Sequence, residues 1–205
     1  MKIGEIKVEA IKLMFANYGY DIQVDDIQRL LSDENYSSYI VNMNGAIARA
    51  LDRIENACVL PLKSYKVNPA DISHGKAFMR FNLALISDLF MIDRVVIEGA
   101  CEYDANAEYE LEADNLVLAN SNSDITIIYY PSVKTVDSNV SDGDELWIPD
   151  KIARLIPYFI KGDLFQEEEP DLAAAARNLF EASLDDMKPQ NQNKQNFVKQ
   201  VYRLY

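Results

Sequence analysis

The chain has 205 residues, of which 49% are hydrophobic and 26% charged, and its formal net charge is −13 at pH 7. This composition is typical of globular proteins, and the length allows one large domain or two small ones with a substantial core. Apolar runs are only a few residues long, far short of the roughly 20 that cross a bilayer, so we expect neither a membrane span nor a signal peptide.

The negative charge is concentrated in two runs that contain no lysine or arginine. Seven acids lie between Glu98 and Asp114, and five more lie between Asp137 and Asp150. Such a surface repels nucleic-acid phosphates, which disfavours a conventional nucleic-acid-binding protein. Acidic runs most often form a solvated surface. A wall along which DNA passes without adhering and an imitation of DNA are the two other interpretations.

The first third of the chain has helical periodicity. Apolar residues at three- and four-residue steps predict a helix from about Gly4 to Asn17 and, after a turn that contains Gly19, a shorter helix from Val24 to Leu31. The strongest helical pattern runs from Tyr36 to Cys58, and Pro61 closes it. Helices of this kind can pack into a bundle.

The period changes to that of strands in the middle of the chain. Four segments there are rich in β-branched and aromatic residues: Phe78 to Leu85, Ile92 to Glu98, Tyr109 to Leu118 and Ile125 to Tyr130. The loops Cys101 to Asn106 and Asn120 to Asp124 suit turns between antiparallel strands. We therefore expect a small sheet of four to five strands, or a sandwich.

Acids alternate with apolar residues in the third of these segments. Glu108, Glu110 and Glu112 alternate with Tyr109, Leu111 and Ala113, which predicts an exposed strand with one wet face that carries the acids.

Helices resume after Gly143. Pro149 suits a first helical position, an apolar stripe follows from Ile152 to Phe159, Gly162 ends the helix, and Pro157 should kink or split it. Acids at Glu167 to Glu169 and at Asp171 suit the start of a last helix. Its amphipathic face comprises Leu172, Ala176, Leu179, Phe180, Ser183, Leu184 and Met187.

The order of elements predicts an α+β fold. Residues 1–75 and 145–187 form a helical bundle from N- and C-terminal helices, residues 76–136 form a central antiparallel β-rich insertion, and residues 188–205 form an extended tail. We find no internal repeat.

The C-terminal tail, Lys188 to Tyr205, is opposite in charge to the rest of the chain. It holds four cations and no acid, and its first half, Lys188 to Asn196, has no apolar side chain, so we expect it to be mobile on its own. The second half forms a basic and aromatic hook made of Phe197, Val198, Lys199, Val201, Tyr202, Arg203, Leu204 and Tyr205. It docks either on its own domain or on another subunit; tyrosine and arginine are common interface anchors.

The sequence contains little that indicates catalysis. None of the seven glycines forms a phosphate-binding GxGxxG or GxxxxGK[ST] motif, and His74, the single histidine, stands in a polar linker and is expected at the surface. Cys58 and Cys101 form no CxxC pair and are expected to be buried free thiols in a reducing compartment. We predict no catalytic residue, metal or cofactor, with a carboxylate-based hydrolase as the remaining enzymatic alternative.

The loop that begins at Asp137 is the best candidate for a cation site, and its pattern is incomplete. It matches an EF-hand at its first, third and fifth positions, but Asp142 occupies the glycine position and Ile148 the place of the bidentate glutamate. A turn and a helix cap are the favoured interpretation of this loop.

Two segments carry a family resemblance. The pattern IVNMNGAIARALDRIENACVLPL from Ile40 to Leu62, a β-rich insertion, and then WIPDKIARLIPYFIKGDLFQEEEPDLAAAARNLFEASLDDM from Trp147 to Met187 resemble head-to-tail connector, or adaptor, proteins of tailed bacteriophages and prophages of Gram-positive bacteria. The resemblance implies a structural virion protein of the neck, made in the host cytoplasm, that forms a ring of about twelve copies between portal and tail.

Partners follow from the same resemblance. The tail docks on the portal protein or on neighbouring subunits, other neck and tail proteins are further partners, and DNA passes without specific binding, with Glu108, Glu110 and Glu112 on a surface that faces its channel. An acidic DNA mimic or inhibitory protein-binding module is the alternative function.

Overall fold

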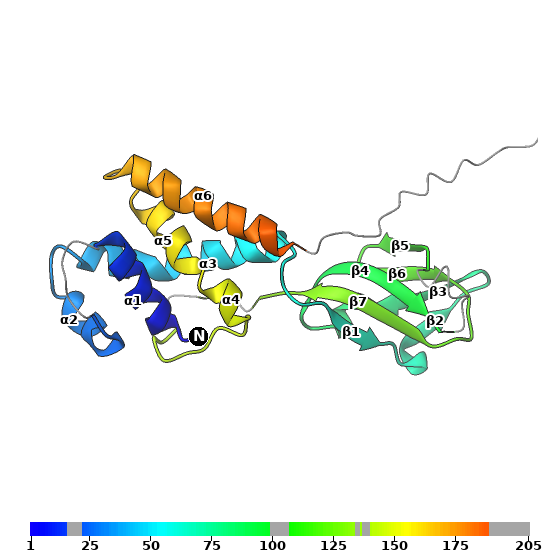
Figure 1. Ribbon diagram of the computed structural model, residues 1–205. Coiled ribbons are helices and arrows are strands. Elements are labelled where there is room, and N and C mark those ends of the chain that lie inside the picture. Colours follow the sequence, from blue (N-terminus) through cyan, green and yellow to red (C-terminus); the bar gives the residue numbers. More distant parts are fainter. Residues whose placement is uncertain (16–21, 99–106, 134–135, 137–139, 189–205) are drawn as a thin grey trace, which may run out of the picture.

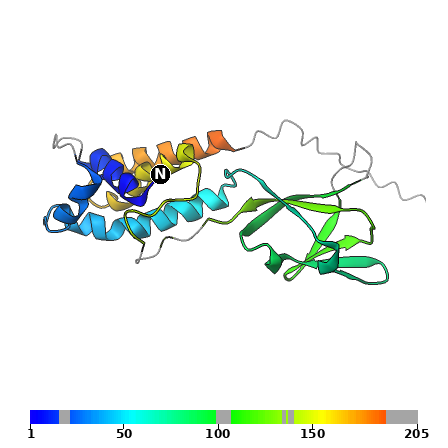
Figure 2. The same cartoon turned by 90° about the horizontal axis from the view of Figure 1, so that it is seen from below.

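The chain forms an elongated molecule with helices at one end and strands at the other (Figures 1 and 2). The computed structural model describes residues 1–15, 22–98, 107–133, 136 and 140–188. The fold is α+β with antiparallel sheets, which confirms the fold class expected from the sequence. The C-terminal tail from residue 189 on, with every residue of the hook, lies outside the described residues, as does the loop from Cys101 to Asn106.

Helices come from both ends of the described chain. Their bounds are α1 Ile3–Met14, the 3-10 turn η2 Val24–Asp26, α2 Ile27–Leu30, α3 Ser37–Asn56, α4 Asp150–Ala153, α5 Ile156–Leu164 and α6 Pro170–Met187. Pro157 stands in the first turn of α5 and separates it from α4, as expected for a residue that cannot donate a backbone hydrogen bond.

One hydrophobic core joins the helices of the two ends. Ile6 of α1, Ile47 of α3, Ile156 of α5 and Phe180 of α6 are buried in it, and α5 packs against α1, α3 and α6. Phe15, Tyr36, Tyr39 and Phe165 extend this core as edge-to-face ring pairs. Because α5 contacts α1, α3 and α6, it joins the helices from the C-terminal part of the chain to those from the N-terminal part.

The strands form two antiparallel sheets that pack on a second core. One sheet has the order β1-β7-β4 and the other β2-β3-β6-β5. The buried side chains between them include Met79, Val95, Leu116 and Ile127. The bounds are β1 Lys63–Lys66, β2 Ile72–His74, β3 Phe78–Asn82, β4 Leu89–Ile97, β5 Tyr109–Glu112, β6 Asn115–Ala119 and β7 Ile125–Pro131. Of the two arrangements left open by the sequence, the sandwich is the one observed.

Several strand predictions need correction. The segment from Tyr109 to Leu118 is a hairpin, β5 and β6, because Ala113 adopts a left-handed conformation with φ of 51° and reverses the chain. The predicted strand from Phe78 ends at Asn82, whose side chain accepts a hydrogen bond from the backbone N–H of Ala84 and starts a 3-10 turn. The loop Asn120 to Asp124 joins β6 of one sheet to β7 of the other and is no hairpin turn.

Two short strands, β1 and β2, are absent from the sequence prediction. Both precede residue 76, where the strand-rich part was expected to begin. β1 has the sequence KSYK and β2 the sequence ISH, so neither carries enough apolar residues to show a strand pattern. Each is defined by its pairing with a longer strand, β1 with β7 and β2 with β3.

The helix predictions also need three corrections. Gly162 does not end α5, which continues to Leu164; it is buried at the contact with α6, where a Cβ would lie 3.0 Å from Cβ of Arg177. Leu172 and Leu179 were assigned to the core face of α6, but their side chains are 49% and 50% exposed. The predicted helix over Val24 to Leu31 is a 3-10 turn followed by the single turn α2.

Candidate interaction surfaces

Helix α6 has an apolar face that is only partly covered by the helical core. Ala173, Ala176, Phe180 and Leu184 face the core, while Leu172, Ala175, Leu179 and Ala182 form a second, exposed apolar stripe beside the first. At about 100° per residue the two stripes together span about 200° of the helix. An ordinary surface helix needs only one such stripe, so the second stripe is a candidate interface.

The polar side of α6 is fixed by ion pairs to its neighbours. Arg53 of α3 donates to Glu181 at 2.6 Å, and Asp163 of α5 lies 3.2 Å from Arg177. The hydrogen bond from Arg53 lowers the pKa of the Glu181 carboxyl. These contacts set the rotation of α6 and so keep Leu172 and Leu179 directed away from the core.

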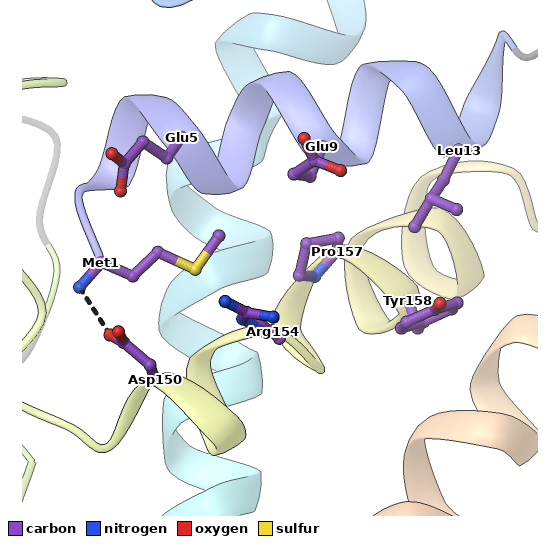
Figure 3. A pocket seen from close by; sticks show the side chains of 8 residues that line it. All are labelled: Met1, Glu5, Glu9, Leu13, Asp150, Arg154, Pro157 and Tyr158. Atoms are coloured by element: carbon purple, nitrogen blue, oxygen red, sulfur yellow. Dashed lines mark hydrogen bonds and ion pairs between the residues drawn. The ribbon is translucent and has the colours of Figure 1, made fainter.

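A groove of about 690 Å³ runs between α1 and the α4–α5 segment (Figure 3). Glu5, Glu9 and Leu13 stand along α1 on one side of it. Asp150, Arg154, Pro157 and Tyr158 line the other side, and the Met1 side chain extends between the two. The groove therefore combines four apolar or aromatic side chains, those of Met1, Leu13, Pro157 and Tyr158, with a polar lining of three carboxylates and two cations.

Local contacts hold the charged groups of this groove. The Glu5 carboxylate accepts a hydrogen bond of 2.7 Å from the backbone N–H of Lys2, and the Met1 amino group lies 3.0 Å from Asp150 Oδ1. The exposed Glu9 is 3.6 Å from the half-buried Lys12, a weak contact that leaves Glu9 open to other cations. Two cations also line the groove, the exposed Arg154 and the Met1 amino group.

Trp147, the single tryptophan of the chain, is 84% exposed. Its neighbours Leu146 and Ile148 are buried in the helical core, so the alternation of an extended segment directs Trp147 outward. A cavity of about 370 Å³ beside it is lined by Ile3, Val133, Val136, Val140 and Leu146 among others. A large aromatic side chain in solvent next to an apolar cavity is typical of an interaction surface.

The acids Glu108, Glu110 and Glu112 are all exposed, as the sequence predicts. Glu110 pairs with Val117 and Glu112 with Asn115, which puts both acids on the outer face of the edge strand β5, and Glu112 lies 3.0 Å from Arg80. Leu111 points to the opposite face but is 58% exposed, because β5 stands at the sheet edge. The acids of this surface and the α6 stripe belong to different ends of the molecule (Figure 1).

The described part of the loop that resembles an EF-hand binds the first turns of α1. Asp142 accepts from Lys7 Nζ at 2.6 Å, and the backbone oxygens of Asp142 and Asp144 accept from the N–H groups of Gly4 and Ile3. Asp144 accepts from the backbone of Ser141. Asp137 and Asn139 lie outside the described residues.

Other candidate chemical groups are dispersed. His74 is exposed on β2, and Cys58 is a half-buried free thiol whose pKa burial raises; Cys101 lies outside the described residues. Among the residues that the structure describes, no three His, Cys, Asp or Glu side chains gather as a metal site requires. Within the same residues, no helix is long and apolar enough to cross a bilayer.

The described surfaces were only partly visible in the sequence. The sequence predicts the acidic surface of β5. It places the exposed stripe of α6 in the core, although the width of the apolar arc of this helix is a signal that the sequence contains. The groove joins residues of α1 to residues of α4 and α5, and neither the groove nor the exposure of Trp147 is among the sequence-based predictions. Comparison with known proteins gives no family for the chain: no family model matches it, and no curated protein matches it.

Proposed function

We propose that the chain is a structural virion protein, a head-to-tail connector or adaptor that forms a ring in the neck of a tailed bacteriophage between portal and tail. The helices of both ends form the bundle of each subunit, and the C-terminal tail docks on the portal protein or on neighbouring subunits. The observation that carries this proposal is the second apolar stripe of α6, the helix that ends at Met187, directly before the basic and aromatic tail.

The exposed apolar side chains of the helical end support a subunit that is incomplete alone. Between 49% and 84% of the surface is exposed at four large apolar residues there: Val41, Trp147, Leu172 and Leu179. A neighbouring subunit in a closed ring would cover such groups, since each interface of a ring joins two different faces of the same chain. Burying an exposed Leu side chain contributes about 1.5–3 kcal/mol, and the gain repeats at each contact of the ring.

The acidic β5 surface supports the same function in a second way. A channel wall that carries carboxylates repels the phosphates of passing DNA and so does not retain it. Glu110 and Glu112 share the outer face of an edge strand, which is a suitable position for such a wall.

The function is tested by binding to the portal protein encoded by the same genome. We expect the full chain to bind portal rings and a chain without residues 188–205 to bind at least tenfold more weakly, because the tail supplies the docking segment. A full-length chain with Lys76→Glu and Lys151→Glu, two exposed lysines outside the tail, makes the same change of −4 in net charge as the truncation and serves as the control. Equal binding with and without residues 188–205, by a chain that stays monomeric with portal, would contradict the proposal.

An acidic DNA mimic or inhibitory protein-binding module is the second candidate, favoured by the outward carboxylates of β5. It predicts capture of a purified nuclease or repressor and loss of that binding when Glu108, Glu110 and Glu112 are all replaced by lysine. Retained portal binding by this triple variant would favour the connector instead.

A further inference from the structure

We propose that the hook, residues 197–205, of one copy binds in the groove between α1 and α4–α5 of a second copy. This inference rests on the proposed function and names a contact between neighbouring subunits. It assigns the groove of Figure 3 a ligand of stated chemistry, a basic and aromatic peptide that this chain itself supplies.

Charge complementarity is the first argument. The groove carries three carboxylates, Glu5, Glu9 and Asp150, against two cations, Arg154 and the Met1 amino group, whereas the hook carries Lys199 and Arg203 and no acidic side chain. Glu9 is exposed on the α1 side, and its ion pair with Lys12 is as long as 3.6 Å, so an arriving cation can replace that contact. A chain of net charge −13 otherwise repels its own copies, and a basic segment is the part of it that an acidic groove attracts.

The apolar side chains of the groove also match those of the hook. Leu13, Pro157, Tyr158 and the Met1 side chain offer aliphatic and aromatic surface in a space of about 690 Å³, within the range of peptide- and ligand-sized sites. The hook supplies Phe197, Tyr202, Leu204 and Tyr205. Aromatic side chains are effective interface anchors because they bury much area and lose few rotamers.

The position of the tail's origin favours a second copy over the same chain. Helix α6 runs toward the sheets and ends there at Met187, in both views of the molecule, whereas the groove lies among the helices (Figures 1 and 2). The sequence from 189 to 196 contains only Pro, Gln, Asn and Lys, and eight residues span at most roughly 26–29 Å. The end of α6 and the groove therefore lie at different places on the helical end, which favours the groove of a neighbouring copy as the binding site of the hook.

The direct test measures binding of a fluorescent peptide of residues 188–205 to the full chain by anisotropy. The recipient carries Lys199→Glu and Arg203→Glu, so that its own hook does not compete. We expect saturable binding that weakens with salt. Adding Glu9→Arg to the recipient should weaken it about tenfold, because an acid of the groove becomes a base.

Two further substitutions sharpen this test. Glu110→Arg makes the same change of net charge on β5, far from the groove, and should leave the affinity unchanged. Arg154→Glu removes a cation from the groove and should strengthen binding. Absence of peptide binding, or equal losses with Glu9→Arg and Glu110→Arg, would overturn the inference.

Mixing two full-length variants separates contact between copies from contact within one chain. The Glu9→Arg chain keeps a hook and lacks a groove, and the Lys199→Glu/Arg203→Glu chain keeps a groove and lacks a hook. Native mass spectrometry, with one chain labelled by ¹⁵N, should show mixed complexes in excess of complexes of either variant alone. A wild-type chain and a mixture that both stay monomeric would overturn the inference. Portal binding is measured separately, so failure of the groove contact does not by itself contradict the connector function.

Discussion

Lys7 Nζ lies 2.6 Å from Asp142 Oδ1, and this ion pair ties α1 to the segment that returns from the sheets. Lys7 is 6% exposed. Among the described residues, it is the one charged residue that is buried. Backbone hydrogen bonds from Ile3 and Gly4 to the same segment lie beside the pair. Two parts of the chain more than 130 residues apart are thus joined at the first turns of α1.

Removal of the two partners of this ion pair should have unequal effects. Asp142→Ala leaves the ammonium of Lys7 buried without an anion and should lower the free energy of unfolding by about 2–3 kcal/mol, whereas Lys7→Met leaves a carboxylate that is 24% exposed and should cost about 1 kcal/mol. Urea unfolding of both variants measures the difference. Equal losses would show that burial of Lys7 does not govern the energetics of the pair.

Alanine at two glycines should act in opposite directions. A Cβ at position 162 would lie 3.0 Å from Cβ of Arg177 and 3.1 Å from the backbone oxygen of Ala173, so Gly162→Ala should push α5 and α6 apart and cost about 1–3 kcal/mol. The exposed Gly45 of α3 meets only the movable end of Arg49, so Gly45→Ala should add about 0.5–1 kcal/mol. Thermal unfolding of the pair is the measurement, and a stabilising Gly162→Ala would contradict the close packing of α5 on α6.

Tyr129 should make the stability of the fold sensitive to alkaline pH. Burial and its hydrogen bond of 2.8 Å to Asp88 raise the pKa of Tyr129 from 10.0 to about 12. Between these values the unfolded chain loses the proton while the folded chain keeps it, so this contribution to stability is full below pH 10 and is lost as the pH rises toward 12. The stability difference between wild type and Tyr129→Phe should therefore shrink from pH 9 to pH 11 in urea titrations. A constant difference would contradict the pKa shift.

Neighbouring residues of α6 should separate assembly from folding. Leu179→Glu changes an exposed side chain and should leave the free energy of unfolding within about 0.5 kcal/mol while it abolishes association of subunits. Phe180→Ala empties a fully buried site and should cost about 3–5 kcal/mol. Calorimetry and size-exclusion chromatography with light scattering measure the two properties. Normal assembly of the Leu179→Glu chain would show that the second apolar stripe of α6 is not an interface between subunits.

Trp147 provides a fluorescent report on assembly because the chain has no second tryptophan. In the isolated subunit, where it is 84% exposed, we expect solvent-exposed emission and strong quenching by acrylamide. Burial against a neighbour should shift the emission to the blue and reduce the quenching. A Trp147→Phe chain provides the background signal, and unchanged emission in assembled particles would place Trp147 outside the interface.

Long, strongly periodic elements were predictable from the sequence. The helix from Tyr36 to Cys58 and the break at Pro157 follow from apolar spacing and from the missing N–H of proline, and the structure has both. β1 and β2 were not predictable, because their pairing with β7 and β3 defines them and their own residues are mostly exposed.

The candidate surfaces divide in the same way. The alternating acids of β5 give an exposed face by local pattern alone, whereas Ala113 hides a hairpin because nothing in its side chain marks a left-handed turn. Leu172 and Leu179 look like core residues by spacing, and the packing of α6 on a single side leaves them exposed, which the width of the apolar arc of the helix already indicates. The groove depends on tertiary contact between α1 and α4–α5, which periodicity does not encode.

The mass of particles formed by the full chain with the portal protein of the same genome tests the connector function most directly. We expect a closed ring of about twelve copies on each portal, resolved as added mass by native mass spectrometry and as an extra layer in electron micrographs. A chain that remains monomeric beside intact portal rings, at concentrations well above those of assembly, would contradict it.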